Sequence, residues 1–138
     1  MSGRVTDPEL LAANSAFYEA LEQADLDALS ELWVAGDEAV CVHPGLPPIH
    51  GAKAVIRSWA AIMASTPYLQ FVLTDTRGDR FGDVGVVSCT ENLLSAPEGM
   101  PETMFAGGRA VATNVFRHLD GRWRMWAHHA SAVEEPDR

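Results

Sequence analysis

Cysteine is scarce in this sequence of 138 residues, which contains only Cys41 and Cys89. These two residues lack the short spacing of metal-binding cysteine pairs. Two isolated cysteines in a chain without a leader segment are more often reduced core thiols than a disulfide. We therefore expect no disulfide, no catalytic thiol and no metal site.

Positive charge is missing from a long stretch near the start of the chain. Residues 5–52 contain nine carboxylates and no Lys or Arg, and the whole chain has a net charge of −9. Nucleic-acid phosphates require a basic surface, so the composition argues against nucleic acid as a partner. The carboxylates are expected to solvate helix faces, and attraction of a basic protein partner is the alternative.

Long apolar runs are also absent. No stretch has the length of a membrane span, and the sequence MSGRVTDPELLAAN at the start lacks the basic and apolar regions of a signal peptide. We therefore expect a cytoplasmic protein without a membrane partner. The hydrophobic fraction of 47% favours one compact domain over residues 1–138, with a core from about residue 8 to residue 133.

The strongest local pattern that is present lies at residues 112–131, where two β-rich runs flank Asp120-Gly121. This dipeptide is typical of a type I′ hairpin turn. A two-residue loop would place Phe116 opposite Met125 and Asn114 opposite Ala127. Because side chains alternate along a strand, one face would carry Asn114, Phe116, Trp123, Met125 and His129, and the other would carry Val111, Thr113, Val115, Arg117, Arg124, Trp126 and His128.

Helical spacing characterises the first half of the chain. Leu10, Asn14, Phe17 and Leu21 predict a first helix, capped by Thr6 or Asp7. A second helix should begin at Asp25 with a stripe of Leu26, Leu29, Leu32 and Trp33, and a third should cover residues 52–64.

Strand patterns alternate with turn residues elsewhere. We expect strands at residues 39–43, 68–76 and 84–94 and from about Met104, with irregular loops at GLPPIHG, RGDRFGD and SAPEGMPET. The segregation of helices and hairpin-connected strands predicts an α+β fold with helices on one face of a curved sheet, which leaves a pocket between them.

Three stretches carry a family resemblance: YEALEQADLDALSELW, VHPGLPPIHGAKAVIRSWAAI and ATNVFRHLDGRWRMWAHHAS. Together they resemble the SnoaL-like branch of the nuclear transport factor 2-like superfamily, which includes ketosteroid isomerases and polyketide cyclases. The resemblance implies a cone-shaped, cystatin-like α+β roll with three N-terminal helices packed on a strongly curved, mainly antiparallel sheet. It also implies dimers formed through the sheet.

The match to ketosteroid isomerases departs at each of their functional positions. The place of the catalytic aspartate is held by His43 before Pro44, and the second acid matches Asn114. The helical tyrosine matches Phe17, with Tyr18 one residue away. Steroid isomerisation is therefore not the expected reaction, and the aspartate–arginine arrangement of limonene epoxide hydrolase has no counterpart here.

Four polar residues form the candidate catalytic site. His43 can transfer a proton near neutral pH, or it can pin the HPG turn through a backbone hydrogen bond. Asn114 can hold a carbonyl, or it can be a buried amide paired to a neighbour such as Glu91. His129 shares the expected face of Asn114. Glu91 should have a raised pKa if it faces the pocket, with His129 or Arg109 as its partner, or it can be a surface charge.

The remaining expectations concern surfaces. A small apolar ligand should contact Phe17, Tyr18, Trp33, Trp59, Met63, Phe116 and Met125, although plain core packing explains the same residues. A second copy of the chain should contact Val115, Arg124, Trp126 and His128.

Two functions from different classes follow. The first is a cofactor-independent isomerase, cyclase or lyase that acts on a hydrophobic carbonyl compound, with His43 as base. The second is a non-catalytic dimeric module that binds an apolar ligand or a protein.

Overall fold

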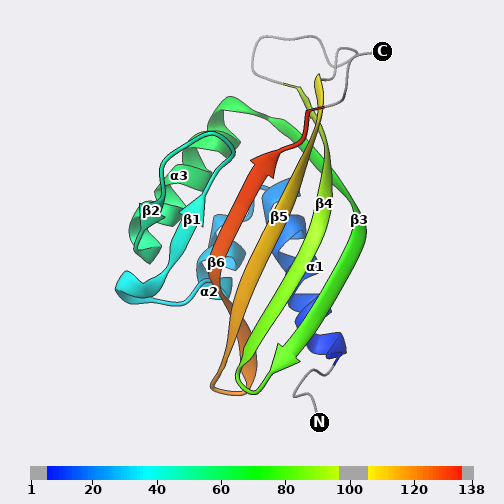
Figure 1. The fold of residues 1–138 in the computed structure, drawn as a ribbon. Coiled ribbons are helices and arrows are strands. Elements are labelled where there is room, and N and C mark those ends of the chain that lie inside the picture. The colour runs from blue at the N-terminus through cyan, green and yellow to red at the C-terminus, as the bar shows by residue number, and fades with distance from the viewer. Residues whose placement is uncertain (1–5, 97–105, 135–138) are drawn as a thin grey trace.

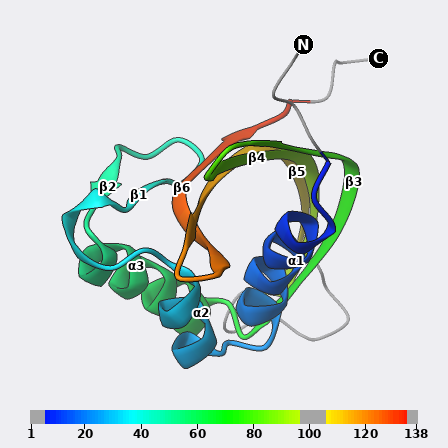
Figure 2. The same ribbon diagram turned by 90° about the horizontal axis from the view of Figure 1, so that it is seen from below.

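The computed structural model describes residues 6–96 and 106–134. Its six strands form one sheet in the order β2-β1-β6-β5-β4-β3. The sheet curls around helix α1, while α3 lies beside β1 and β2 and α2 lies between α1 and α3 (Figures 1 and 2). The predicted α+β fold, with three helices on a strongly curved and mainly antiparallel sheet, is confirmed. No helix of the described residues is long and apolar enough to cross a membrane.

Helix α1 spans Pro8–Glu22 and begins at Asp7, whose carboxylate accepts the backbone N–H groups of Glu9 and Leu10. These contacts satisfy donors that the first helical turn cannot pair internally. The predicted face is confirmed, because the structure buries all of Leu10, Asn14, Phe17 and Leu21.

The other two helices are α2 (Leu26–Leu32) and α3 (Ala52–Ser65). The predicted stripe on α2 is wrong at Leu26, which is an exposed residue. Trp33 follows the helix in extended conformation, yet its side chain is buried in the core. Trp33 therefore reaches the core from the residue that follows the helix and not from its apolar stripe.

Strand β1 covers Val40–Val42, and β2 covers Ile49–His50. The prediction of an irregular loop over residues 45–51 is wrong at its end, because Ile49 pairs with Cys41 across an antiparallel ladder. Proline lacks a backbone N–H and cannot donate to a ladder. The two prolines before Ile49 lie outside the paired residues, so they do not disturb this pairing.

The long strands are β3 (Tyr68–Phe81), β4 (Val84–Ala96), β5 (Ala106–Leu119) and β6 (Arg122–Ala132). The turn predicted to begin at Arg77 is wrong: a bulge between Thr74 and Arg77 lets β3 continue to Phe81. The expected strand start near Met104 and residues 97–103 of the loop lie outside the described residues.

The hairpin of β5 and β6 has the predicted turn, because Asp120 and Gly121 both have positive φ. Its register is as predicted from Leu119 to Phe116, which pairs with Met125. A bulge then places Val115 opposite Ala127, so that Trp126 is the extra residue.

This bulge reverses the two faces beyond Trp126. His128 is buried on the inner face, and His129 is exposed on the outer one. The predicted inward position of His129 and outward position of His128 are therefore both wrong. The physical reason is that one additional residue changes the side-chain alternation of every residue after it.

Strand β1 joins the sheet through a parallel ladder to β6, in which Cys41 pairs with His128. This ladder brings residues from opposite ends of the sequence together. It carries His43, which follows β1, to the same end of the sheet as His128.

Candidate functional site

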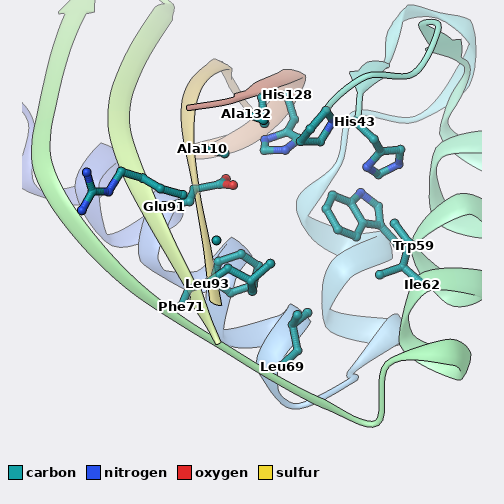
Figure 3. Close-up of a pocket in the computed structure, with 14 residues that line it drawn as sticks. His43, Trp59, Ile62, Leu69, Phe71, Glu91, Leu93, Ala110, His128 and Ala132 are labelled. Atoms are coloured by element: carbon teal, nitrogen blue, oxygen red, sulfur yellow. The ribbon is translucent and has the colours of Figure 1, made fainter. Parts of the chain in front are cut away.

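A cavity of about 270 Å³ lies between α3 and the inner face of the sheet. Figure 3 shows His43 and Trp59 on one side of it, Glu91 on the opposite side and His128 between them. Most of the remaining wall is apolar and includes Ile62, Leu69, Phe71, Leu93 and Ala110. The site is thus an apolar chamber with three titratable side chains.

His43 is buried at the end of β1, with its Nε2 atom 3.0 Å from Ser58 Oγ and 3.7 Å from Cys41 Sγ. The imidazole packs against the Trp59 indole in a T-shaped arrangement, with ring centroids 4.6 Å apart. Burial lowers the pKa of His43, so the neutral ring is favoured at neutral pH. The HPG turn is held by its backbone, because the His43 carbonyl accepts the Leu46 N–H.

His128 is more deeply enclosed than His43. Its Nδ1 atom lies 2.6 Å from the Oδ1 atom of Asn114. Burial, reinforced by the neighbouring His43 and His129, lowers the pKa of His128 to about 3. An imidazole with this pKa stays uncharged throughout the physiological range.

Glu91 faces the cavity, so of the two predicted alternatives, a pocket residue or a surface charge, the structure shows the first. Its Oε2 atom accepts a 2.6 Å hydrogen bond from the Tyr18 hydroxyl, so its partner is Tyr18 rather than His129 or Arg109. Burial raises the pKa of Glu91, and the hydrogen bond from Tyr18 opposes this shift in part. The Glu91 carboxyl therefore keeps its proton to a higher pH than an ordinary glutamate side chain does.

Asn114 is fully buried behind these residues and does not line the cavity. Its amide nitrogen donates to Asn14 Oδ1 at 2.8 Å and to the Tyr18 hydroxyl at 3.1 Å. The structure therefore places Asn114 away from the cavity, where residues of α1 and His128 of β6 pair its amide. The buried-amide alternative is the correct one, although its partners are not Glu91.

Trp59 is the one predicted ligand-binding residue that lines the cavity. Phe17 fills the narrow end of the cone, with its ring centroid 5.7 Å from Trp59 and 5.0 Å from His128. This packing seals the core from the cavity. The other residues predicted to contact a ligand do not line this cavity. They are Phe17, Tyr18, Trp33, Met63, Phe116 and Met125.

Sequence reasoning missed Ser58 and misplaced His128. A serine on a helix gives no signal of its own, because its hydroxyl usually bonds a carbonyl of the preceding turn. His128 could have been found only by recognising the bulge. Within residues 6–96 and 106–134, no three His, Cys, Asp or Glu side chains are grouped so that they could hold a metal ion.

The comparison with protein families gives a match over most of the chain. A model of the SnoaL-like domain matches residues 10–135. Among curated proteins, F-box protein SKIP8 of Arabidopsis thaliana is 26% identical over 128 residues, which are 93% of this chain and 51% of that protein. The chain thus spans about half the length of this curated relative.

Solved structures give closer matches. A Streptomyces avermitilis protein named "putative dehydratase from the NTF2-like family" is 45% identical, with a TM-score of 0.82 over 92% of this chain and 95% of that one. A Thiobacillus denitrificans protein named "putative calcium/calmodulin-dependent protein kinase type II association domain" is 31% identical, with a TM-score of 0.73 over 94% of this chain and 99% of that one.

A more distant structure shows the fold alone. It is an NTF2-like protein with a cystatin-like fold from Novosphingobium aromaticivorans, 18% identical, with a TM-score of 0.73 over 93% of this chain and 82% of that one. The predicted cystatin-like roll agrees with this likeness.

Proposed function

Because this chain belongs to the SnoaL-like domain family, we propose that it is a cofactor-independent enzyme of the isomerase, cyclase or lyase type that acts on a hydrophobic carbonyl compound. Dehydration of a β-hydroxy carbonyl compound is the reaction that the site favours. The observation that carries this proposal is that His43 and Glu91 line one apolar cavity, where burial favours the neutral form of each. The name of the Streptomyces avermitilis relative supports the same class.

The two histidines are suited to different tasks. A general base works best when its pKa lies near the operating pH. His128, with a pKa of about 3, is too weakly basic for this role. The pKa of His43 is also lowered by burial, but this ring is less enclosed and is the better base. His128 serves as a neutral acceptor that orients the ligand.

Glu91 completes the reaction as general acid. His43 takes the proton from the carbon next to the carbonyl, and the electron pair of that C–H bond forms the new double bond. The bond from the β-carbon to the hydroxyl oxygen breaks, and this oxygen receives the Glu91 proton and leaves as water. Solvent then returns the proton from His43 to Glu91, which restores both groups.

The test is turnover of hydrophobic β-hydroxy carbonyl compounds, followed by the absorbance of the conjugated product. We expect His43→Gln and Glu91→Gln to lower kcat about 100-fold or more, since each removes one proton-transfer group. His129→Gln is the matched control, because this adjacent histidine is exposed on the outer face. Equal rates for wild type and His43→Gln would refute the proposed base.

The second candidate is a non-catalytic dimeric module that binds a ligand or protein. It is favoured by the exposed apolar side chains on the outer face of the sheet, Val72, Leu94 and Val111. The association-domain name of the Thiobacillus denitrificans relative points the same way. Saturable binding of hydrophobic carbonyl compounds, unaffected by His43→Gln and without any turnover, would favour this module over the enzyme.

A further inference from the structure

The hydrogen bonds around Ser58 determine which nitrogen of His43 carries the proton. The Ser58 hydroxyl donates to the Val55 carbonyl at 2.6 Å. A serine hydroxyl has a single proton. The 3.0 Å contact between Ser58 Oγ and His43 Nε2 must therefore be donated by the histidine. In a neutral imidazole this leaves Nδ1 of His43 unprotonated.

The hydrogen bonds around Asn114 determine which ring nitrogen of His128 carries the proton. Both hydrogen atoms of the Asn114 amide nitrogen are engaged, one by Asn14 and one by the Tyr18 oxygen. The Asn114 carbonyl oxygen can only accept, so His128 donates to it from Nδ1. The orientation of the amide is supported independently at Tyr18, whose own proton goes to Glu91 and whose oxygen is thus free to accept.

We infer that Ser58 and Asn114 are positioning residues that fix the two cavity histidines in opposite tautomers, with the proton on Nε2 in His43 and on Nδ1 in His128. Among the hydrogen bonds of the described residues, Nδ1 of His43 and Nε2 of His128 have no partner. Each ring thus keeps one free lone pair, and both rings line the cavity.

This inference gives the proposed function a more specific ligand, and to that extent it rests on the proposed function. Two acceptor nitrogens select a ligand that brings donors, which are a hydroxyl group and an acidic C–H. The tautomers themselves are a property of the protein without ligand. They can therefore be tested whether or not turnover occurs.

The first experiment is two-bond ¹H–¹⁵N correlation NMR of ¹⁵N-histidine-labelled protein at about pH 8, where both buried rings are neutral. The coupling pattern of each ring reports which nitrogen is protonated. We expect the Nε2–H pattern for His43 and the Nδ1–H pattern for His128, assigned by the loss of each in His43→Gln and His128→Gln. The opposite tautomer in either ring would overturn the inference.

The second experiment removes the Ser58 acceptor. In Ser58→Ala we expect His43 to lose its single-tautomer pattern while His128 keeps its own. Ser65→Ala is the matched control, because Ser65 also donates to the carbonyl three residues earlier on α3 but is exposed. An unchanged His43 pattern in Ser58→Ala would show that Ser58 does not position the ring.

Asn114 requires a variant that keeps the fold. In Asn114→Asp the carboxylate still accepts from His128 Nδ1, so we expect the Nδ1–H pattern to remain. In Asn114→Ala that acceptor is lost, and we expect a mixture of tautomers. A mixture in Asn114→Asp, or a retained single tautomer in a folded Asn114→Ala protein, would contradict the assigned role. If Asn114→Ala does not fold, the wild-type and Asn114→Asp spectra still decide the inference.

Discussion

At the scale of single residues, the site depends on side chains whose surroundings change their affinity for protons. His128 and Glu91 face one cavity, and burial disfavours the charged form of each. The pKa of the histidine falls and that of the glutamate rises. The cavity is therefore less charged near neutral pH than its residue types suggest.

The lowered pKa of His128 makes stability depend on pH. Below about pH 6.5 the unfolded chain binds a proton at this ring, whereas the folded chain does not until about pH 3. The contribution of His128 to the free energy of unfolding is complete above pH 6.5 and is lost at about 1.4 kcal/mol per pH unit as the pH falls. Denaturant unfolding between about pH 6 and pH 4 should show this slope as the contribution of His128.

The variant His128→Gln isolates the contribution of this ring. As the pH falls, its free energy of unfolding should decrease less steeply than that of wild type. The difference between the two slopes should be about 1.4 kcal/mol per pH unit, independent of how stable the variant is at pH 7. His129→Gln should retain the wild-type slope, because the side chain is exposed. Parallel pH curves for wild type and His128→Gln would show that His128 is protonated in the folded state.

At the scale of elements, the sequence predicted α1, α3 and the β5–β6 turn because each has a strong local signal. Residues Leu10 to Leu21 repeat at helical spacing, and Asp120-Gly121 is specific for a tight hairpin. The bulges have no such signal. They arise where the strands bend to wrap around α1, which is a tertiary requirement.

The errors in the predicted site have two origins, the bulge in β6 and the packing of the core. The residue types were correct, since a histidine and a glutamate face the cavity. The register placed the wrong member of the His128-His129 pair inside. Packing decided the other error, because the aromatic residues of α1 and β5 fill the cone and leave the cavity to α3 and the strand ends.

Helix α1 approaches the sheet closely at Gly85. A Cβ atom added there would lie 2.5 Å from Leu10 Cδ1, and Leu10 is fully buried. We expect Gly85→Ala to lower the free energy of unfolding by about 1–3 kcal/mol through overpacking. Gly108→Ala on β5 is the control, with no heavy atom within 4 Å of the added carbon. Equal stability of the two variants in denaturant unfolding would contradict this expectation.

At the scale of the whole molecule, the order of elements and the family resemblance were sufficient to predict the fold class. The surface for a second copy was harder to predict. Arg124 donates to the Glu31 carbonyl, and the Trp126 ring lies 5.3 Å below the Arg117 guanidinium. His128 is buried. Three of the four residues proposed for the dimer thus have partners within their own chain.

The outer face of β3, β4 and β5 offers a different surface for the proposed dimer. Val72, Leu94 and Val111 are 51%, 42% and 45% exposed. We expect sedimentation at micromolar concentration to show a dimer, and Val111→Glu to raise its dissociation constant about 10-fold or more, since the added charge would be buried. Leu46→Glu is the control, because this exposed residue lies in the loop between β1 and β2. A monomeric wild type would refute the proposed dimer.

The parallel ladder between β1 and β6 also sets the order of events on the ribosome. Residues 40–42 leave the exit tunnel long before residues 127–129, which are their partners in the sheet. Helices α1 and α2 precede β1 in the chain, whereas α3 and β6, the strand that separates β1 from β5, follow it. The wall that unites His43 with His128 is therefore assembled from the earliest and the latest strands of the nascent chain, and no shorter growing chain contains the site.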